Sequence, residues 1–526
     1  MIFSRPEQSA NKIIILMHRR RFIHQSFLVS AAWTTGLNIP LPSTRTDTWE
    51  RVAATVETAP SIQLPLDKRI PLGWPAFPVS HQAELTVLKF SKPTLRSSNV
   101  WLRLTAAIDF REEKKIDVLI PRTGEKIGQF NIRYAHPFQP FQISLTKKDL
   151  RRIKKDGLAL RQVDGEKDAW FFSPNTDRSD NTGLQPHLLV GSSENPQAAY
   201  KKNMYDMHAF SPFGWMGGCV LDALWEMAQK NDEAAEENLS KHLDYFLDNE
   251  YGIRYENPKT EPMDGRFNSI EDFLPFAVIA QNNPGHKSVQ RALDFLLAHE
   301  EADGLIVSGP QISTEGCYTV AYPLAVLAVE RNDVDLAKKA IKQISLRARY
   351  LMNDDGIHQR GARDGSVGFK NWGRGIAWLM LGTAKVIRTL NKGGYQHLPA
   401  LIELTYILQR SASLIMPFQS AEGLWKSFVD RPHTAIDTSA SAGIAAALAW
   451  GYQSGVLDEA FKEKARTTHA NLPMFLTPDG FLTQVSQINR GGEALQESDF
   501  RVISQFGMGL MAQLDCALQP HAQSIF

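Results

Sequence analysis

From about residue 205 to the C-terminus, the sequence alternates between apolar helical segments and charged ones. Apolar segments begin near Phe213, Phe267, Thr314, Asn371, Ile436 and Gln496, at intervals of 54, 47, 57, 65 and 60 residues. Charged partner segments lie near residues 234–249, 286–300, 334–352, 396–416 and 457–470. A repeat of this length is typical of stacked helical hairpins, whose apolar helices face inward and whose charged helices face solvent. The pattern predicts a mainly α fold at residues 201–526, in which six helical pairs close into an (α/α)6 toroid.

Ahead of the helical region, residues 84–192 contain short runs with the composition of β-strands. The runs are Glu84–Phe90, Asn99–Phe110, Ile116–Ile120, Gln129–Ala135, Pro140–Leu145, Leu158–Val163, Ala169–Pro174 and His187–Ser192. This number of short strands predicts an N-terminal all-β sandwich over residues 76–200, after a Thr-, Pro- and Ser-rich linker at 33–75. We expect the sandwich to brace the toroid or to form one wall of a cleft.

Residues 1–32 are basic and have the layout of an export signal. Arginines at 19–21 precede a weakly apolar stretch at 26–33 that contains small residues. This order is typical of a cleavable signal of twin-arginine type, with translation starting at Met17. The signal predicts a periplasmic or extracellular protein. The alternative is a basic N-terminus without an address.

Charge and composition narrow the classes of partner. The chain of 526 residues has a net charge of +1, and removing residues 1–32 leaves 53 basic against 56 acidic side chains. Such a mildly acidic body lacks the net basic face that nucleic-acid binding needs. Three cysteines are too few for a disulfide framework or a zinc cluster, and no apolar run reaches the roughly 18 residues of a membrane helix. We therefore expect no metal, no cofactor, no nucleic-acid partner and no integral membrane segment. The oligomeric state stays open.

The loops ahead of the apolar helices carry acids, arginines and aromatic residues. Because the inner helices of a toroid begin at one end, these loops are expected to line one funnel. The tryptophans expected there are Trp215, Trp372, Trp378 and Trp425. Carboxyl pairs beside aromatic faces suit glycoside cleavage, since one acid protonates the leaving oxygen, another activates water or attacks, and an indole stacks on the sugar. The alternative is that each acid only caps its helix. Motifs of serine hydrolases, zincins and P-loop NTPases do not occur.

Three motifs resemble those of a known enzyme group. The run Glu422–Pro432, continued by Asp437–Ala442, resembles the GLW(Y/H)QVLDxP…LETSASA stretch of unsaturated glucuronyl and rhamnogalacturonyl hydrolases. Asn371–Trp378 resembles their WxRGxGW motif, and Glu315–Tyr318 with Pro323–Ala325 is similar to their D-G-L-Y-M…P-F-L-A helix start. The resemblance covers about residues 205–520 and implies a six-hairpin glycosidase. It extends to exo-acting β-glucuronidases that pair a toroid with an N-terminal β-domain.

The departures from that pattern concern the reacting acids. The resemblance places Glu315 where those hydrolases have their proton-donating aspartate, and Asn268 near their second pocket aspartate. Glu271 and Asp272 lie within a turn of Asn268. An unsaturated uronide needs one acid, which protonates the C4–C5 double bond and then directs water, whereas a saturated glycoside needs two carboxyls. We therefore predict Glu315 as the general acid and Glu271 or Asp272 as its partner, about 6.5–9.5 Å away, for hydrolysis with inversion.

Arginines and further side chains are expected to bind the substrate. Arg374, Arg431 and Arg360 are candidates for a bidentate clamp on a carboxylate. The other expected binding residues are Trp372, Trp378, Trp425, His358, Tyr318 and Asp437, the last also being the third choice as partner of Glu315. The predicted function is exo-acting removal of a terminal, glucuronosyl-type uronic acid from a plant or algal oligosaccharide or polysaccharide.

Three alternatives stay open. The first is an unsaturated glucuronyl or rhamnogalacturonyl hydrolase that hydrates the C4–C5 double bond. The second is a polysaccharide lyase with Tyr318, His358 or His433 as base. The third is a glycan-binding protein without catalytic activity.

Overall fold

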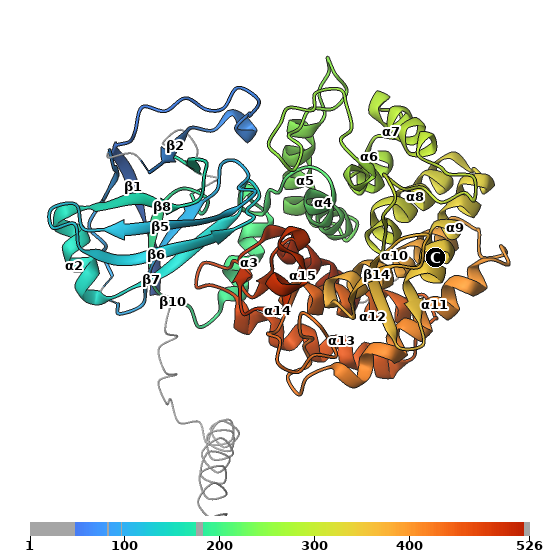
Figure 1. The fold of residues 1–526 in the computed structure, drawn as a ribbon. Coiled ribbons are helices and arrows are strands. Elements are labelled where there is room, and N and C mark those ends of the chain that lie inside the picture. The colour runs from blue at the N-terminus through green and yellow to red at the C-terminus, as the bar shows by residue number, and fades with distance from the viewer. Residues whose placement is uncertain (1–47, 82–83, 96, 175–181, 520–526) are drawn as a thin grey trace, which may run out of the picture. The chain divides into compact units, whose positions relative to one another are not determined.

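The computed structural model describes residues 48–81, 84–95, 97–174 and 182–519. The predicted export signal at residues 1–32 lies outside these ranges. Figure 1 shows strands in the N-terminal part of the described chain, coloured blue to cyan, and mostly helices in the remainder, coloured green to red. Within the described residues, no helix is both long enough and apolar enough to cross a membrane.

The described N-terminal residues form ten strands. They are β1 (Thr48–Thr58), β2 (Ala76–Val79), β3 (Thr86–Phe90), β4 (Val100–Thr105), β5 (Glu113–Leu119), β6 (Lys126–Arg133), β7 (Pro140–Leu145), β8 (Leu158–Asp164), β9 (Ala169–Phe172) and β10 (His187–Ser192). Eight of them join into one sheet with the order β6-β5-β8-β3-β1-β10-β4-β7, and β2 pairs with β9 separately. The predicted β-rich region is confirmed, and its division into the two layers of a sandwich stays a prediction.

Strand β1 differs from the sequence prediction because it lies inside the segment expected to be a linker. It pairs with β10 through Thr48–Ala53 and with β3 from Ala54 onward, so it joins the two halves of the sheet. Its only fully buried side chains are Val52 and Ala54. The Trp, Val and Thr residues of this segment suit a strand, and β10 along its first half and β3 along its second half supply the hydrogen-bonding partners. Residues 48–58 are therefore part of the sheet.

Six α-helices form the inner ring of the helical region. They are α4 (Trp215–Ala228), α6 (Phe276–Asn282), α8 (Tyr322–Arg331), α10 (Gly373–Lys392), α12 (Thr438–Gln453) and α15 (Gln505–Leu518). Each packs against the next, and α15 packs against α4, which closes the ring. Small residues set the close approach of neighbours: a Cβ added at Gly509 would lie 2.6 Å from the carbonyl oxygen of Cys219. The predicted toroid is confirmed.

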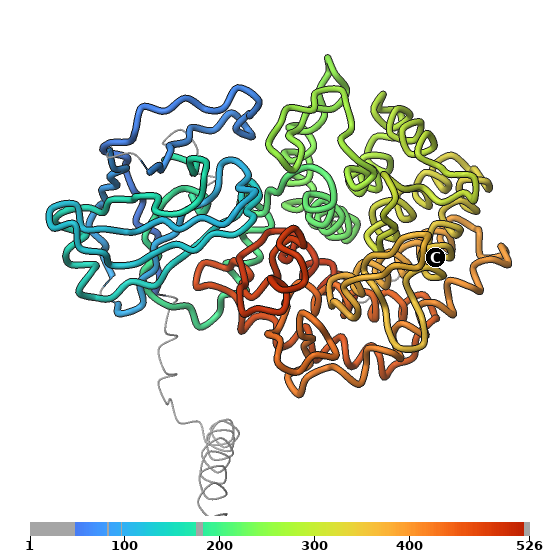
Figure 2. The backbone as a smooth tube through the Cα atoms, viewed as in Figure 1, coloured from blue at the N-terminus to red at the C-terminus, as the bar shows by residue number. Residues whose placement is uncertain are grey.

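Five outer helices pack on inner ones, in the pairs α4 with α5, α6 with α7, α8 with α9, α10 with α11 and α12 with α13. Their bounds are α5 (Glu233–Phe246), α7 (Lys287–Ala298), α9 (Val334–Leu351), α11 (Leu401–Ile415) and α13 (Glu459–Asn471). All five lie close to the predicted partner segments. The smooth tube of Figure 2 follows these hairpins around the ring.

Shorter elements lie between the hairpins and within the N-terminal β-region. The α-helices among them are α2 (Lys147–Asp156), α3 (Pro196–Met204) and α14 (Gly492–Glu497), and the strands are β11 (Ile312–Ser313), β12 (Met352–Asn353), β13 (Gly356–Gly361), β14 (Val367–Lys370), β15 (Val485–Ser486) and β16 (Arg501–Val502). The 3-10 helices are η1 (Pro71–Gly73), η2 (Met207–Ala209), η3 (Ile270–Phe273), η5 (Met416–Phe418), η6 (Leu472–Phe475) and η7 (Asn489–Gly491), and η4 (Cys317–Ala321) is a π-helix.

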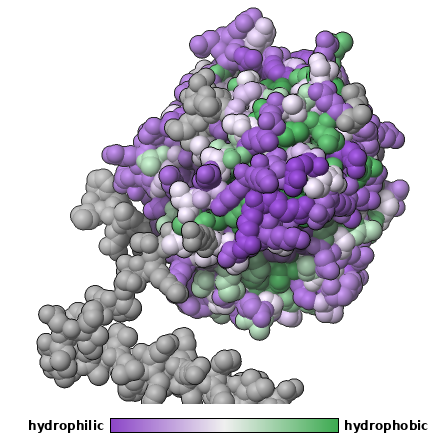
Figure 3. All heavy atoms as spheres, turned by 90° about the vertical axis from the view of Figure 1, so that its left-hand side faces the viewer, coloured by the Kyte–Doolittle hydropathy of each residue, from purple (hydrophilic) through white to green (hydrophobic). Residues whose placement is uncertain are grey.

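The β-region and the helical region are joined by buried polar contacts. Asp479, which is fully buried, accepts hydrogen bonds from Arg103 at 2.7 and 3.0 Å and from Arg51 at 2.9 Å. The Gln505 side chain of α15 donates to the carbonyl of Phe138, in the loop between β6 and β7, at 2.7 Å. Figure 3 shows that the molecular face on the left of Figure 1 is mostly hydrophilic, with smaller hydrophobic areas.

Candidate active site

Two glutamates lie near each other at the N-terminal ends of two neighbouring inner helices. Glu271 is in η3, ahead of α6, and Glu315 lies between β11 and the π-helix η4, ahead of α8. Their carboxyl groups are hydrogen bonded to each other, which requires a proton on one of them. The negative charge of Glu315, followed by burial, raises the pKa of Glu271 well above its usual value, although Arg360 and Arg490 act in the opposite direction. The pair therefore holds a proton at a pH where isolated carboxyls have lost theirs.

Local hydrogen bonds fix the backbone that carries Glu271. The side chain of Ser269 accepts from the Glu271 N–H at 3.2 Å, and Asp272 accepts from the Ser269 N–H at 3.1 Å, forming a capping box. Asp272 also accepts from the Asn268 N–H and from the hydroxyl of Tyr255, each at 2.7 Å. Burial raises the pKa of Asp272 to about 6. The carboxylate of Asp272 is occupied by these hydrogen bonds, so Asp272 stabilises the start of η3. Of the two acids predicted as partner of Glu315, Glu271 is therefore the one that interacts with it.

The segment on either side of Glu315 is held just as firmly. The guanidinium of Arg347 donates to the carbonyls of Ser313 at 3.1 Å and Ile306 at 2.6 Å. Gly316 is required here because a Cβ would lie 2.1 Å from Nε of Arg347. The π-helix that follows is a rare element, frequent at functional sites. These contacts fix the backbone on both sides of Glu315.

The expected separation of the two acids stays a prediction. A water molecule between an acid and a base needs about 6.5–9.5 Å between carboxyl groups. Glu271 and Glu315 act on each other through charge and hydrogen bonding, which places their carboxyl groups near each other. The sequence does not reveal this, because the distance depends on how η3 and η4 pack together.

The three arginines of the predicted carboxylate clamp have different surroundings. Arg374 is buried and donates to the carbonyls of Ser486 and Gln487, each at 2.6 Å. Arg431 forms an ion pair with Glu497 and lies over the ring of Phe428. These two guanidinium groups are thus engaged by protein, contrary to the expectation. Arg360 lies over the ring of Phe369, at 4.9 Å from its centroid, and its buried Nε has no hydrogen-bond partner within the part of the chain that the structure describes.

The tryptophans are mostly packing residues rather than exposed platforms. Trp372, Trp378 and Trp425 are at most 3% exposed, and the Trp425 indole donates to the carbonyl of Ile415 at 3.1 Å. Trp372 packs on the Arg374 guanidinium at 4.7 Å from the ring centroid. Trp215 is half-buried at the start of α4. The predicted role in sugar stacking therefore fits Trp215 and not the other three, because their rings face the core.

The remaining predicted residues also have structural partners. Tyr318 is fully buried and donates to Asp222 at 2.5 Å, and burial raises its pKa far above the usual value, which removes it as a base. Asp437 caps α12 through the N–H groups of Ser439 and Ala440, although its buried Oδ2 finds no hydrogen-bond partner among the residues described. His358 is 6% exposed in β13, and burial lowers its pKa.

Sequence reasoning missed Arg490 and the neighbourhood of Arg360. Arg490 lies in η7, is exposed, and acts electrostatically on Glu271. Beside Arg360, a cavity of about 380 Å³ is lined by Phe369 of β14, Glu493 of α14 and backbone of the β13–β14 hairpin. Neither feature has a local signal, because loops more than 100 residues apart in the sequence create both.

These positions can be compared with known proteins. Residues 314–518 match the model of Glycosyl Hydrolase Family 88. The predicted enzyme class, a glycoside hydrolase, is confirmed by this match. So is the resemblance to the unsaturated glucuronyl and rhamnogalacturonyl hydrolase group. Glu315 lies inside the matched residues, whereas Glu271 lies outside them.

A curated relative and two solved structures show the extent of the similarity. The chain is 28% identical over 142 residues to the unsaturated rhamnogalacturonyl hydrolase YesR of Bacillus subtilis, which is 26% of this chain and 38% of that protein. The chain thus aligns with well under half the length of this relative. A possible member of the GH105 family from Salmonella enterica serovar Paratyphi A has a TM-score of 0.51 and 17% identity, covering 58% of this chain and 82% of that one.

A family 105 glycoside hydrolase from C. acetobutylicum has a TM-score of 0.50 and 18% identity, covering 59% of this chain and 94% of that one. At these identities the likeness concerns the fold alone. Since nearly all of that structure is covered by 59% of this chain, the rest of this chain has no counterpart there.

Proposed function

We propose that this protein removes a 4,5-unsaturated uronic acid residue from the end of a glycan, with Glu271 as proton donor and Glu315 as the carboxylate that directs water. The observation that carries this function is the direct hydrogen bond between the two carboxyl groups, together with the raised pKa of Glu271. It reverses the expected roles, since the proton resides on Glu271.

The chemistry of an unsaturated uronide fits such a pair. The reaction adds a proton to C4 and the oxygen of a water molecule to C5, and the adduct then opens and releases the next sugar. A proton donor must still be protonated near neutral pH, which the raised pKa of Glu271 provides. Once that proton has left, the pair carries two negative charges and can accept a proton from the attacking water. No second carboxyl on the far side of the sugar is needed.

Arg360 is the arginine best placed to bind the uronate carboxylate. Its guanidinium acts on the pKa of Glu271, and its Nε has no partner among the described residues. Arginine suits a carboxylate because two of its N–H groups can donate in parallel. We further propose that the protein is exported, so that it meets glycans of plant or algal origin outside the cytoplasm.

A saturated terminal uronide is the second candidate. Two carboxyls occupy this site, and a retaining glycosidase needs them about 5–5.5 Å apart. Binding of a sugar between Glu271 and Glu315 would have to separate their hydrogen-bonded groups.

One experiment tests both candidates. Oligosaccharides with an unsaturated uronate end, and their saturated counterparts, are incubated with the protein while the ultraviolet absorbance of the C4–C5 double bond and the release of reducing sugar are followed. The proposal expects the absorbance to fall on the unsaturated set. Reducing sugar released only from the saturated set would favour the second candidate. A rise in absorbance would identify a lyase, and no change in either signal would contradict both hydrolases.

A further inference from the structure

The loop that leads to Glu271 is held by residues of the N-terminal region. This loop, residues 253–266, is separated from η3 only by residues 267–269. Arg69 donates to both carboxylate oxygens of Asp264, at 2.6 and 2.8 Å, and to the carbonyl of Tyr255 at 2.9 Å. It also forms an ion pair with Glu256. One guanidinium therefore joins both ends of the loop.

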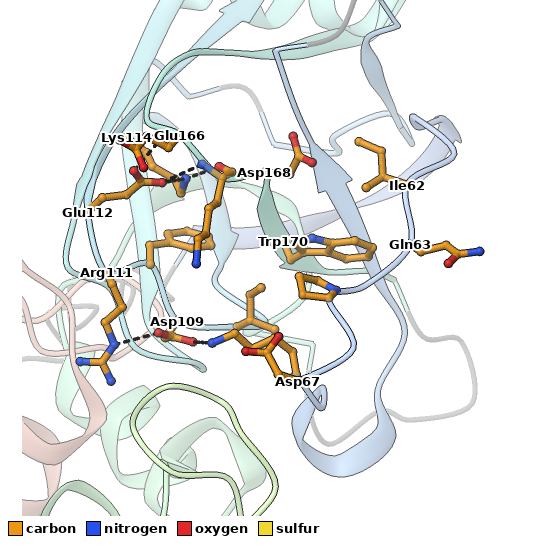
Figure 4. A pocket seen from close by; sticks show the side chains of 15 residues that line it. Ile62, Gln63, Asp67, Asp109, Arg111, Glu112, Lys114, Glu166, Asp168 and Trp170 are labelled. Carbon is orange, nitrogen blue, oxygen red and sulfur yellow. Dashed lines mark hydrogen bonds and ion pairs between the residues drawn. The ribbon is translucent and has the colours of Figure 1, made fainter.

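A second set of contacts holds the middle of the same loop. Asp109, which follows β4, accepts from the Thr260 hydroxyl at 2.7 Å and from Lys68 at 3.0 Å. Arg111 donates to Asp109 at 2.8 Å and to the carbonyl of Pro258. Figure 4 shows the side chain of Arg111 beside Asp109, and both residues line a cavity of about 440 Å³ together with Lys68. Thr260 is fully buried and has a φ of 57°, a conformation that a β-branched residue keeps only where its surroundings hold it.

A continuous path leads from these contacts to Glu271. The carbonyl of Tyr255 binds Arg69, and the hydroxyl of the same residue donates to Asp272 at 2.7 Å. The Asn268 N–H donates to that hydroxyl at 3.0 Å. Asp272 in turn completes the capping box that fixes η3. Tyr255 and Asp272 are at most 2% exposed, so the path runs through packed side chains.

We propose that Lys68, Arg69, Asp109 and Arg111 form a clamp that positions Glu271 against Glu315, with Arg69 as its main positioning residue. The inference rests on the proposed function, in which Glu271 donates the proton. All four residues of the clamp, like Glu271 itself, lie outside the residues matched by the family model, so this chain uses its own N-terminal region to complete the acid pair. A displacement of about 1 Å in a reacting group is enough to lower a rate roughly 100-fold.

The test compares Arg69→Gln with the wild type, using Arg69→Lys as the conservative variant and Arg152→Gln as the matched control. Arg152 also binds a carboxylate through two nitrogens, that of Glu125, but it lies on α2. We expect Arg69→Gln to lower kcat roughly 10- to 100-fold with little change in KM. We expect Arg69→Lys to recover part of the loss and Arg152→Gln to behave as wild type.

The pH profile separates positioning from mere stability. Glu271 faces the carboxyl of Glu315 and the charges of Arg360 and Arg490, with Asp272 on its own helix. If the clamp is loosened, Glu315 acts on Glu271 from farther away, and the alkaline limb of kcat moves to lower pH. A loss of activity that only follows the folded fraction, with an unchanged limb, would overturn the proposal. Asp264→Asn weakens the ion pair between Arg69 and Asp264 by changing the acid instead of the arginine. It replaces Arg69→Gln in the test if that variant does not fold.

Amide hydrogen exchange keeps this inference separate from the proposed function. We expect the amides of residues 267–273 to exchange faster in Arg69→Gln than in the wild type, and not faster in Arg152→Gln. This readout needs no substrate. If the wild type has no activity, the proposed function fails while exchange still tests the clamp, and equal exchange in all variants would reject it.

Discussion

Two clusters of acids lie within the same ring of helices, and they differ in their counter-charges. In the first cluster, Asp222 and Glu226 of α4 face Lys385 and Arg388 of α10. Lys385 contacts Asp222 at 2.9 Å and Glu226 at 2.8 Å, and Arg388 contacts Glu226 at 2.6 Å. Burial opposes the ionisation of Glu226, but the two cations outweigh it and lower its pKa.

In the second cluster, the nearest neighbour of an acid is another acid. Glu271 and Glu315 share a hydrogen bond, and the pKa of Glu271 rises instead of falling. The arginines Arg360 and Arg490 act on Glu271 but do not cancel the effect of Glu315. Acids whose charge is balanced by nearby cations, as in the first cluster, hold inner helices together. Two acids without such balance, as in the second cluster, keep a proton that can be transferred to a substrate. Similar residues thus serve structure in one place and suit chemistry in the other.

The largest expected effect comes from removing the stored proton. Glu271→Gln should lower kcat by roughly 10²- to 10⁴-fold, the range of general acid catalysis, because an amide cannot donate the proton. Glu315→Gln should have an effect in the same range. Steady-state rates on the unsaturated oligosaccharides measure this, and Glu300→Gln, at a partly exposed ion pair with Lys339, is the control. Activity within about threefold of the wild type would remove the substituted glutamate from the mechanism.

The compensated cluster should respond through stability. Lys385→Met leaves Asp222 and Glu226 with less positive charge in a fully buried site, and we expect a loss of about 3–5 kcal/mol in the free energy of unfolding. Lys339→Met breaks a partly exposed pair with Glu300 and should cost about 1 kcal/mol or less. Denaturant unfolding compares the two variants. Equal losses would show that the buried cluster does not depend on its counter-charges.

Substrate selection should depend on Arg360 rather than on Arg431. Arg360→Ala should reduce the preference for a uronide over the matching hexoside by about 1.5–3 kcal/mol, the value of a charge-assisted hydrogen bond. Arg431→Ala should leave it nearly unchanged, since this arginine is engaged by Glu497. The ratio of kcat/KM for the two sugars is the measurement. Equal turnover of both sugars by the wild type would contradict a carboxylate site altogether.

The smallest expected effect is a gain in the free energy of unfolding when one of the two glutamates is replaced by an uncharged residue. Because the folded state raises the pKa of Glu271, it binds the proton more tightly than the unfolded chain does. The contribution of Glu271 to the free energy of unfolding is complete below its unfolded pKa of about 4.3. It is lost as the pH rises through its raised pKa in the folded state. Glu271→Gln should therefore be more stable than the wild type at neutral pH, because the amide carries no charge that Glu315 repels. Parallel curves of Tm against pH for the two proteins would contradict this.

Local patterns were enough to predict most of the elements. The start predicted near Asn371 lies two residues before α10, and that predicted near Ile436 two residues before α12. Helical periodicity depends on near neighbours in the sequence, so it can be recognised without a tertiary structure. β1 shows the limit, because its strand conformation depends on pairing with β10, more than 130 residues away in the sequence.

The side-chain directions at the site depended on contacts across the sequence. The motif around Arg374 and Trp372 was recognisable, but the carbonyls that bind Arg374 come from residues 486 and 487, more than 100 positions away. The motif alone is equally compatible with an Arg374 guanidinium that is free to bind a substrate carboxylate. The periodicity of the sequence thus specified the ring of helices. The acids in the loops ahead of neighbouring helices predicted Glu271 and Glu315 as site residues. Only the packing of η3 against η4 decided that these acids touch, because a distance of a few ångströms depends on every contact that holds the two loops.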